Sequence, residues 1–320
     1  MYNVSAYGKM IADGPRIRAY TDVLRRAIKP GSVVVDLGSG PGYFAIVACE
    51  LGARRVFAIE PDNIIQVGRD AAHDRGVADR IEFIQDLSTK VTLPEQADVI
   101  VSDLRGILPW FQQHIPSIID ARSRFLAPGG VLIPSVDRVW AAVVELPARY
   151  EEVVRPWEQS GLKSGRRLAV NSTSKVRAQP GDLLGQPVCW HELDYGHVEE
   201  VNFSNNFSLT ATRAGTAHGL ALWFDTELFE GTGFSNAPGE TELIYGNAFF
   251  PFEQAVEIVS DDRFEIRLEA RLIGEDYAWR WDTTVTSGGH AKCSFKQSTL
   301  FGVPLSVSQL HQQATEKFSE

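Results

Sequence analysis

Apolar positions in the first half of the chain follow two different spacings. In residues 1–30 they recur every three or four residues, which predicts helices. Apolar runs of strand length lie at 33–36, 55–60, 81–86, 97–103 and 131–134, and helical patterns at 43–51, 61–75 and 111–125 separate most of them. Strands that alternate with helices are typical of a parallel sheet. We therefore expect an N-terminal helical segment at 1–30 and an α/β domain with a Rossmann-like, parallel-rich sheet at 31–145.

The second half of the chain follows a period of two instead. Apolar and polar residues alternate at 206–213, 219–229, 255–259, 263–272 and 279–286. Such runs, bounded by Gly, Pro, Asn or Asp, predict an antiparallel β-barrel or sandwich over 146–320. Residues 156–186 are rich in Gly, Ser, Arg and Lys and show weak periodicity. We expect this segment to be an inserted arm, either projecting or mobile.

The first strand and its following turn carry the clearest chemical signal. The run that ends in Asp36 continues directly into Gly38, Gly40 and Gly42, and the second run ends in Glu60. Strand, glycine loop, helix and strand-end acid form a nucleotide-binding unit, in which Glu60 can accept hydrogen bonds from both ribose hydroxyls. The glycine spacing is not the Gly-x-Gly-x-x-Gly of dinucleotide sites, which disfavours a nicotinamide-binding protein without excluding it.

The charge of Asp36 narrows the choice of nucleotide. A carboxylate just before the loop would repel a pyrophosphate but suits the ammonium group of a ligand. S-adenosylmethionine has an ammonium group, a sulfonium and an adenosine, and no phosphate. We therefore interpret the loop as an S-adenosylmethionine site; the alternative is a tight strand-to-helix turn without a ligand.

Composition bounds the possible partners. Hydrophobic residues make up 44% and charged residues 22% of the 320 positions, as in a globular chain. The net charge of −10 argues against a nucleic-acid surface. The chain shows no secretory signal, no apolar stretch that could span a bilayer and no metal-ligand spacing of His or Cys. We expect a cytoplasmic protein that uses no metal and binds neither nucleic acid nor membrane.

Several motifs occur in one characteristic order. They are Met10-x-x-Asp13-x-x-Arg16-x-x-x-Tyr20, Asp36-Leu-Gly-Ser-Gly40, Ile59-Glu60, Asp98-Val-Ile-Val-Ser-Asp103 and Gly219-x-x-x-Trp223-Phe-Asp225. In this order the chain resembles the protein arginine methyltransferases over nearly its whole length. The resemblance implies a helical segment, a methyl-donor domain, a β-barrel and an arm that forms a homodimer.

The resemblance also implies a role for particular residues. Arg16 would pair with the donor carboxylate, and Met10 would pack near the donor methyl group. Gly38 and Gly40 would line the donor, and Glu60 would hold its ribose. The residues near the adenine edge would be Asp86, Leu87 and Ser88.

The acceptor end departs from the family pattern. The family has a hairpin with two glutamates that grip the guanidinium of an arginine; here the matching positions are Asp103 and Gln112, with Arg105 between them. The family's Thr-His-Trp tripeptide is absent from the chain. One acid, one amide and one arginine match a guanidinium fork poorly. We therefore expect a methyltransferase that acts on a nitrogen, or else an oxygen, of a small molecule or peptide, positioned by Asp103 and Gln112.

Other interpretations stay open at this point. The chain could be a protein-arginine N-methyltransferase with a relaxed acidic hairpin, or a non-catalytic scaffold that binds S-adenosylmethionine. Arg105 could bind an acidic substrate group or face solvent. Tyr2 and Tyr7 could form a lid over the donor or belong to the core, and Tyr245 and Asn247 could line the acceptor pocket or be ordinary barrel residues.

Overall fold

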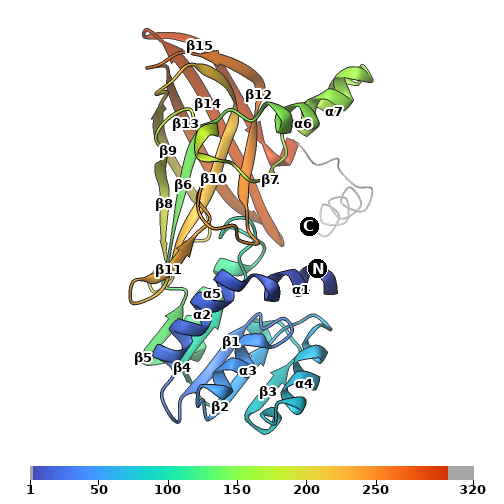
Figure 1. Cartoon of the computed structure of the whole chain (residues 1–320), viewed down its shortest axis with the longest axis vertical. Helices are drawn as coiled ribbons and strands as arrows, with labels where there is room; N and C mark the ends of the chain where they lie inside the picture. The colour runs from blue at the N-terminus through green and yellow to red at the C-terminus, as the bar shows by residue number, and fades with distance from the viewer. Residues whose placement is uncertain (1–2, 302–320) are drawn as a thin grey trace, which may run out of the picture.

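The computed structural model describes residues 3–301 and begins with two helices (Figure 1). They are α1 (Val4–Ala12) and α2 (Gly14–Ala27). Asn3 accepts a hydrogen bond from the N–H of Ala6 at the start of α1, and Asp13 accepts one from Arg16 at the start of α2, so both helices have side-chain N-caps. Figure 1 shows this predicted helical segment between the α/β domain and the barrel.

The α/β domain has a five-stranded parallel sheet in the order β3-β2-β1-β4-β5. Its strands are β1 (Val33–Leu37), β2 (Arg55–Ile59), β3 (Ile81–Ile84), β4 (Ala97–Ser102) and β5 (Leu126–Ile133). Its helices are α3 (Tyr43–Glu50), α4 (Ile65–Asp74) and α5 (His114–Phe125), with short 3-10 turns η1 (Ala78–Arg80) and η2 (Ser88–Lys90). All five residues of the central strand β1 are buried. The strand order reverses between β1 and β4, and ligands bind at such switch points because the following loops diverge there.

Two antiparallel sheets build the barrel, in the orders β7-β12-β10-β6-β8 and β15-β14-β13-β9, and β11 pairs with β10. The strands are β6 (Val136–Val144), β7 (Ser174–Val176), β8 (Val188–Asp194), β9 (Phe203–Thr210), β10 (Gly215–Phe229), β11 (Thr232–Ser235), β12 (Asn247–Ile258), β13 (Arg263–Ile273), β14 (Asp276–Ser287) and β15 (His290–Ser298). Two 3-10 turns, η3 (Pro180–Asp182) and η4 (Thr299–Phe301), complete the described elements of this half. The expected α/β domain followed by a β-barrel is therefore confirmed.

The boundary between the two domains lies earlier in the chain than residue 145, where the sequence pattern places it. Strand β6 pairs along its whole length with β10 and also with β8, so it belongs to the barrel. We therefore place the boundary ahead of β6 rather than at residue 145. Proline does not continue a ladder of hydrogen bonds, and Pro134 separates β5 from β6.

The inserted arm is helical and begins before the predicted range. It consists of α6 (Pro147–Gln159) and α7 (Lys163–Ala169), which project from the side of the barrel (Figure 1). The turn between them contains Gly161 at φ 71°, a conformation that favours glycine. Among the described residues, no helix is long and apolar enough to cross a membrane.

Candidate functional site

A cavity of about 920 Å³ lies where the carboxyl ends of β1, β2 and β4 meet α1 and the lower end of the barrel. The predicted site residues that line it are Met10, Arg16, Asp36, Gly38, Gly40, Glu60, Asp103 and Gln112. Asp86, Leu87 and Ser88 follow β3 and do not line it; Leu87 is 48% exposed. Their proposed contact with the adenine edge therefore stays a prediction.

The glycine loop brings backbone close to this cavity. Gly38 has φ 70°, and a Cβ atom placed on it would lie 2.1 Å from Cδ2 of Leu104 in the loop after β4. Gly40 has φ 53°, and its Cβ would lie 3.1 Å from the ring of Tyr7 on α1. Glycine permits both the left-handed conformation and the close approach. Tyr7 lines the cavity, as a lid residue would, whereas Tyr2 lies outside the described residues.

Backbone N–H groups hold the two strand-end acids in place. Glu60 Oε2 accepts a hydrogen bond from the N–H of Gly40 at 2.9 Å, and Oε1 accepts one from Asp62 at 2.9 Å. Asp36 Oδ2 accepts one from Ala45 at 2.9 Å. Burial raises the pKa of Asp36 to about 7 and also raises the pKa of Glu60. The donor half of the cavity thus offers acids that suit an ammonium group and ribose hydroxyls, so its residues fit S-adenosylmethionine.

Asp103 at the end of β4 has a different environment. Its Oδ2 atom lies 2.5 Å from Nη2 of Arg16 and accepts a hydrogen bond of 2.6 Å from the Tyr245 hydroxyl. Its Oδ1 atom lies 3.0 Å from Nη2 of Arg105 and accepts a hydrogen bond from Nε at 3.1 Å. Burial alone would raise the pKa of Asp103, but the two guanidinium groups lower it to about 2. Asp103 is therefore a poor general base.

The alternative that Arg105 faces solvent is wrong. Its side chain is completely buried, with Nη1 2.9 Å from Oδ1 of Asp137 and Nη2 2.5 Å from the Tyr20 hydroxyl. Asp137 is itself buried and accepts a hydrogen bond of 2.6 Å from the Tyr195 hydroxyl. Arg105 thus has protein partners instead of solvent, and its contact with an acidic substrate group stays a prediction. Residues from α2 and two barrel strands supply these partners, and their convergence on the loop is a property of the tertiary fold.

Arg16 connects the two halves of the cavity. Besides its pair with Asp103, its Nη1 donates to the backbone carbonyl of Met10 at 2.9 Å, and its Nε donates to the Tyr245 hydroxyl at 3.1 Å. It still lines the cavity, so its contact with the donor carboxylate stays a prediction. The sequence pattern did not reveal that Tyr245 binds both Arg16 and Asp103, because a barrel tyrosine has no motif that distinguishes it.

Gln112 and Asp276 meet at the acceptor end. Gln112 has φ 45°, which is unusual for a residue other than glycine, and its N–H donates to Oδ1 of Asp276 at 3.0 Å. Both residues are exposed and line the cavity. Asn247, in contrast, accepts a hydrogen bond from Ala178 and donates one to Asn236, so it has the structural role of a barrel residue.

Aromatic side chains form the wall of the cavity on the barrel side. Trp110, Phe250, Tyr277 and Trp279 line it and are buried. The ring centroids of Trp110 and Trp279 are 5.9 Å apart, and those of Phe250 and Trp279 are 5.2 Å apart. Such a wall suits planar, apolar groups.

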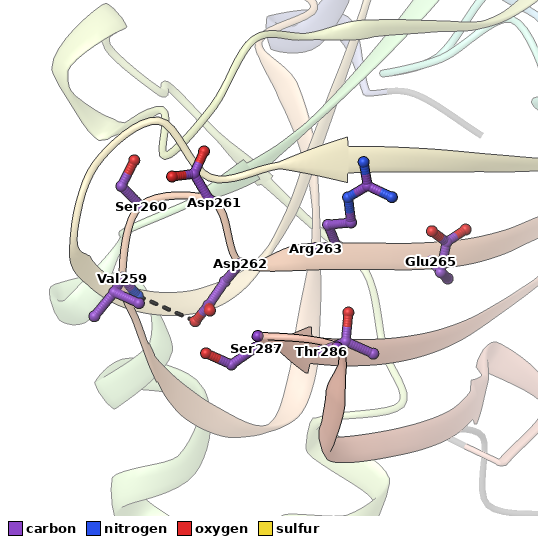
Figure 2. A pocket seen from close by; sticks show the side chains of 10 residues that line it. Val259, Ser260, Asp261, Asp262, Arg263, Glu265, Thr286 and Ser287 are labelled. Carbon is purple, nitrogen blue, oxygen red and sulfur yellow. Dashed lines mark hydrogen bonds between the residues drawn. The ribbon is translucent and has the colours of Figure 1, made fainter.

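A second cavity, between the β12–β13 and β14–β15 turns, has no comparable chemistry (Figure 2). Its Asp262 carboxylate accepts a hydrogen bond from the N–H of Val259 at 3.1 Å, and Lys292 binds the same carboxylate at 2.8 Å. Among residues 3–301, no group of three or more His, Cys, Asp or Glu side chains could hold a metal ion. The first cavity is therefore the candidate functional site.

Comparison with known proteins agrees with the geometry of both domains. Residues 19–145 match the family model of ribosomal protein L11 methyltransferase, and residues 137–274 match that of the arginine methyltransferase oligomerization subdomain. Protein arginine N-methyltransferase PRMT10 of Oryza sativa subsp. japonica is 38% identical over 268 residues, which cover 73% of this chain and 70% of that protein. Protein arginine N-methyltransferase 6 of Xenopus laevis is 28% identical over 283 residues, which cover 81% of each chain.

Solved structures share the fold at low identity. Arabidopsis thaliana protein arginine methyltransferase 10 has a TM-score of 0.82 at 20% identity, covering 92% of this chain and 97% of that chain. The Trypanosoma brucei PRMT1 enzyme–prozyme complex with AdoHcy gives 0.82 at 19% identity, covering 91% and 96%. The fold and the donor half of the cavity define an S-adenosylmethionine-dependent methyltransferase. The identity with the Oryza protein places the chain in the protein arginine methyltransferase family, which confirms the resemblance seen in the motifs.

Proposed function

We propose that this methyltransferase transfers the methyl group of S-adenosylmethionine to an uncharged nitrogen, or else an oxygen, of a small molecule or peptide. The observation that carries this proposal is the state of Asp103, whose two oxygens already bind the guanidinium groups of Arg16 and Arg105. A guanidinium acceptor would need carboxylate oxygens with free lone pairs. The two guanidinium groups also offset the negative charge of Asp103, so little attraction remains for a third cation.

The residues of the chain divide the work of the reaction. When bound, S-adenosylmethionine supplies an electrophilic methyl group. Glu60 would accept hydrogen bonds from the ribose, Asp36 would face the ammonium group, and the aromatic wall would hold the acceptor in line. Because the pKa of Asp103 is about 2, this carboxylate would not remove a proton from the acceptor. This condition favours a nitrogen with a free lone pair over a hydroxyl.

A survey of acceptors tests this proposal. Purified protein is incubated with labelled S-adenosylmethionine and separate panels of amines, nitrogen heterocycles, phenols and arginine-rich peptides. We expect methyl transfer to uncharged nitrogen or oxygen nucleophiles and little to arginine. Formation of methylarginine alone would contradict the proposal. Binding of S-adenosylhomocysteine without turnover of any acceptor would instead support the non-catalytic scaffold.

A second candidate is protein-arginine methylation, which the relatives favour together with one contact in the cavity. Asp276 lies next to Gln112, at the end where the family has its second glutamate. A carboxylate there could replace part of the contact that the family's second glutamate makes with a guanidinium. If so, Asp276→Asn would abolish methylarginine formation on a peptide, while Glu275→Gln, the neighbouring exposed acid, would leave it unchanged.

We also propose that the chain forms a homodimer through its arm. Helix α6 and the turn after it expose Trp157 (38%) and Leu162 (58%), and the matched oligomerization subdomain includes this region. Light scattering of the wild type and of a Trp157→Ala/Leu162→Ser variant tests this assignment. We expect a dimer that dissociates in the variant; a monomeric wild type would contradict it.

A further inference from the structure

We propose that Arg105 determines the class of acceptor, because it occupies the carboxylate of Asp103 and thereby restricts the site to uncharged nucleophiles. This inference deepens the proposed function and rests on it. Arg105 lies two residues after Asp103, in the same loop at the switch point of the sheet. It lines the cavity, yet its own side chain is completely buried.

The hydrogen-bond partners of Asp103 show how Arg105 acts. Arg16 and Tyr245 already bind Oδ2, and both are part of the wall between the two halves of the cavity. Oδ1 would be the oxygen left for an acceptor, but Nε and Nη2 of Arg105 occupy it at 3.1 and 3.0 Å. Without Arg105, one oxygen of a fully ionised carboxylate would become available to a cationic acceptor.

The remaining contacts of Arg105 hold the guanidinium in this position. Nη1 donates to Asp137 at 2.9 Å and also to Thr226. Nη2 donates to the Tyr20 hydroxyl at 2.5 Å, which fixes the orientation of the guanidinium. The guanidinium carbon lies 5.2 Å from the ring centroid of Phe224 and 5.4 Å from that of Phe234. These groups come from α2 and three barrel strands, so a cationic acceptor could not displace Arg105 without breaking contacts in both domains.

The test compares two ligands that differ only in charge. A glycine-rich peptide with one arginine and the same peptide with citrulline, its neutral isostere, are titrated calorimetrically into protein saturated with S-adenosylhomocysteine. For the wild type we expect the arginine peptide to bind no tighter than the citrulline peptide. In an Arg105→Met/Asp137→Asn variant, the ratio of affinities should shift at least about tenfold toward arginine, because Oδ1 of the Asp103 carboxylate becomes available to a cation while the net charge of the site stays the same.

The matched control is Asp137→Asn alone, which keeps Arg105 on Asp103; because it removes only a negative charge, the ratio should not shift toward arginine. If the double variant does not fold, Arg105→Gln replaces it, since the glutamine amide can still donate to Asp137; we expect a shift in the same direction. An unchanged ratio in a folded variant that binds S-adenosylhomocysteine would overturn the role of Arg105, and so would the absence of binding of both peptides to every form. A wild type that prefers and methylates the arginine peptide would instead overturn the proposed function.

Discussion

The donor and acceptor halves of the cavity both have carboxylates at the same edge of one sheet, but the partners of these carboxylates differ in kind. Within residues 3–301, the hydrogen bonds to Asp36 and Glu60 come from backbone N–H groups, and neither acid forms an ion pair. Asp103 instead binds two arginine side chains. Backbone dipoles orient a carboxylate and leave its charge for a ligand, whereas guanidinium groups cancel that charge. The position of an acid at a strand end therefore does not reveal which cation it serves.

The largest effect on stability should come from removing Asp103, the carboxylate that pairs with two arginines in the acceptor half. Asp103→Ala leaves Arg16 and Arg105 buried without their shared partner, which should lower the free energy of unfolding by about 3–5 kcal/mol. Urea unfolding measures this loss. Asp276→Ala, an exposed acid in the same cavity, should lower it by about 1 kcal/mol or less. Equal losses of stability in the two variants would mean that the buried ion pairs of Asp103 do not stabilise the fold more than an exposed acid does.

The low pKa of Asp103 should make its contribution to the free energy of unfolding depend on pH. Its folded pKa of about 2 lies below the usual value of an aspartate, so its contribution to stability is complete above about pH 4 and is lost as the pH falls through 2. Asp103→Asn should lack this component. Acid unfolding of the two proteins measures it, and parallel profiles between pH 4 and 2 would contradict the assignment.

In the donor half, removal of Glu60 should affect binding more than stability. If Glu60 holds the ribose as proposed, Glu60→Ala should weaken S-adenosylhomocysteine binding by about 100-fold, the effect of two hydrogen bonds to a charged group. Isothermal calorimetry measures the change. Glu82→Ala serves as the control, because Glu82 is an exposed acid on β3 that pairs with Arg55. A loss of only a few fold in Glu60→Ala would remove Glu60 from the donor site.

Asp36 should make donor binding depend on pH near neutrality. With the pKa raised to about 7, Asp36 is mostly protonated at pH 5.5, and a ligand ammonium group prefers its ionised form. Affinity for S-adenosylhomocysteine should therefore rise by about tenfold from pH 5.5 to 7.5. Asp36→Asn should bind more weakly with a flat profile. A flat profile for the wild type would show that Asp36 does not face the ammonium group.

The smallest effect should come from Gln112. Gln112→Ala keeps the same backbone strain and removes only the amide, so the specificity constant for an identified acceptor should fall by about threefold to tenfold, as for one neutral hydrogen bond. Gln113→Ala is the control, because the Gln113 amide donates to the carbonyl of Gly274 at 2.9 Å. If both variants behave alike, the side chain of Gln112 does not contact the acceptor.

The elements that sequence reasoning predicted well are those with local causes. The strand, glycine loop and helix around β1 depend on a short apolar run and on turn residues, and buried and exposed residues alternate clearly in β13 and β14. The arm and β15 were less predictable. Helix α7 has only seven residues. Most residues of β15 are exposed, and its sequence is largely polar. Short or exposed elements carry little periodic signal, and their pairing partners decide their structure.

The sequence by itself determined the donor half of the site. Its loop and acids lie on two adjacent strands with short connections, so spacing and charge are sufficient to identify the ligand class. Only the tertiary structure decided the acceptor half. Asp103 meets Arg16 from 87 positions earlier and Tyr245 from 142 positions later, and Arg105 meets Asp137 from 32 positions away. Whether a buried charge is open to a ligand depends on the partners that folding brings to it, and no local pattern records those partners.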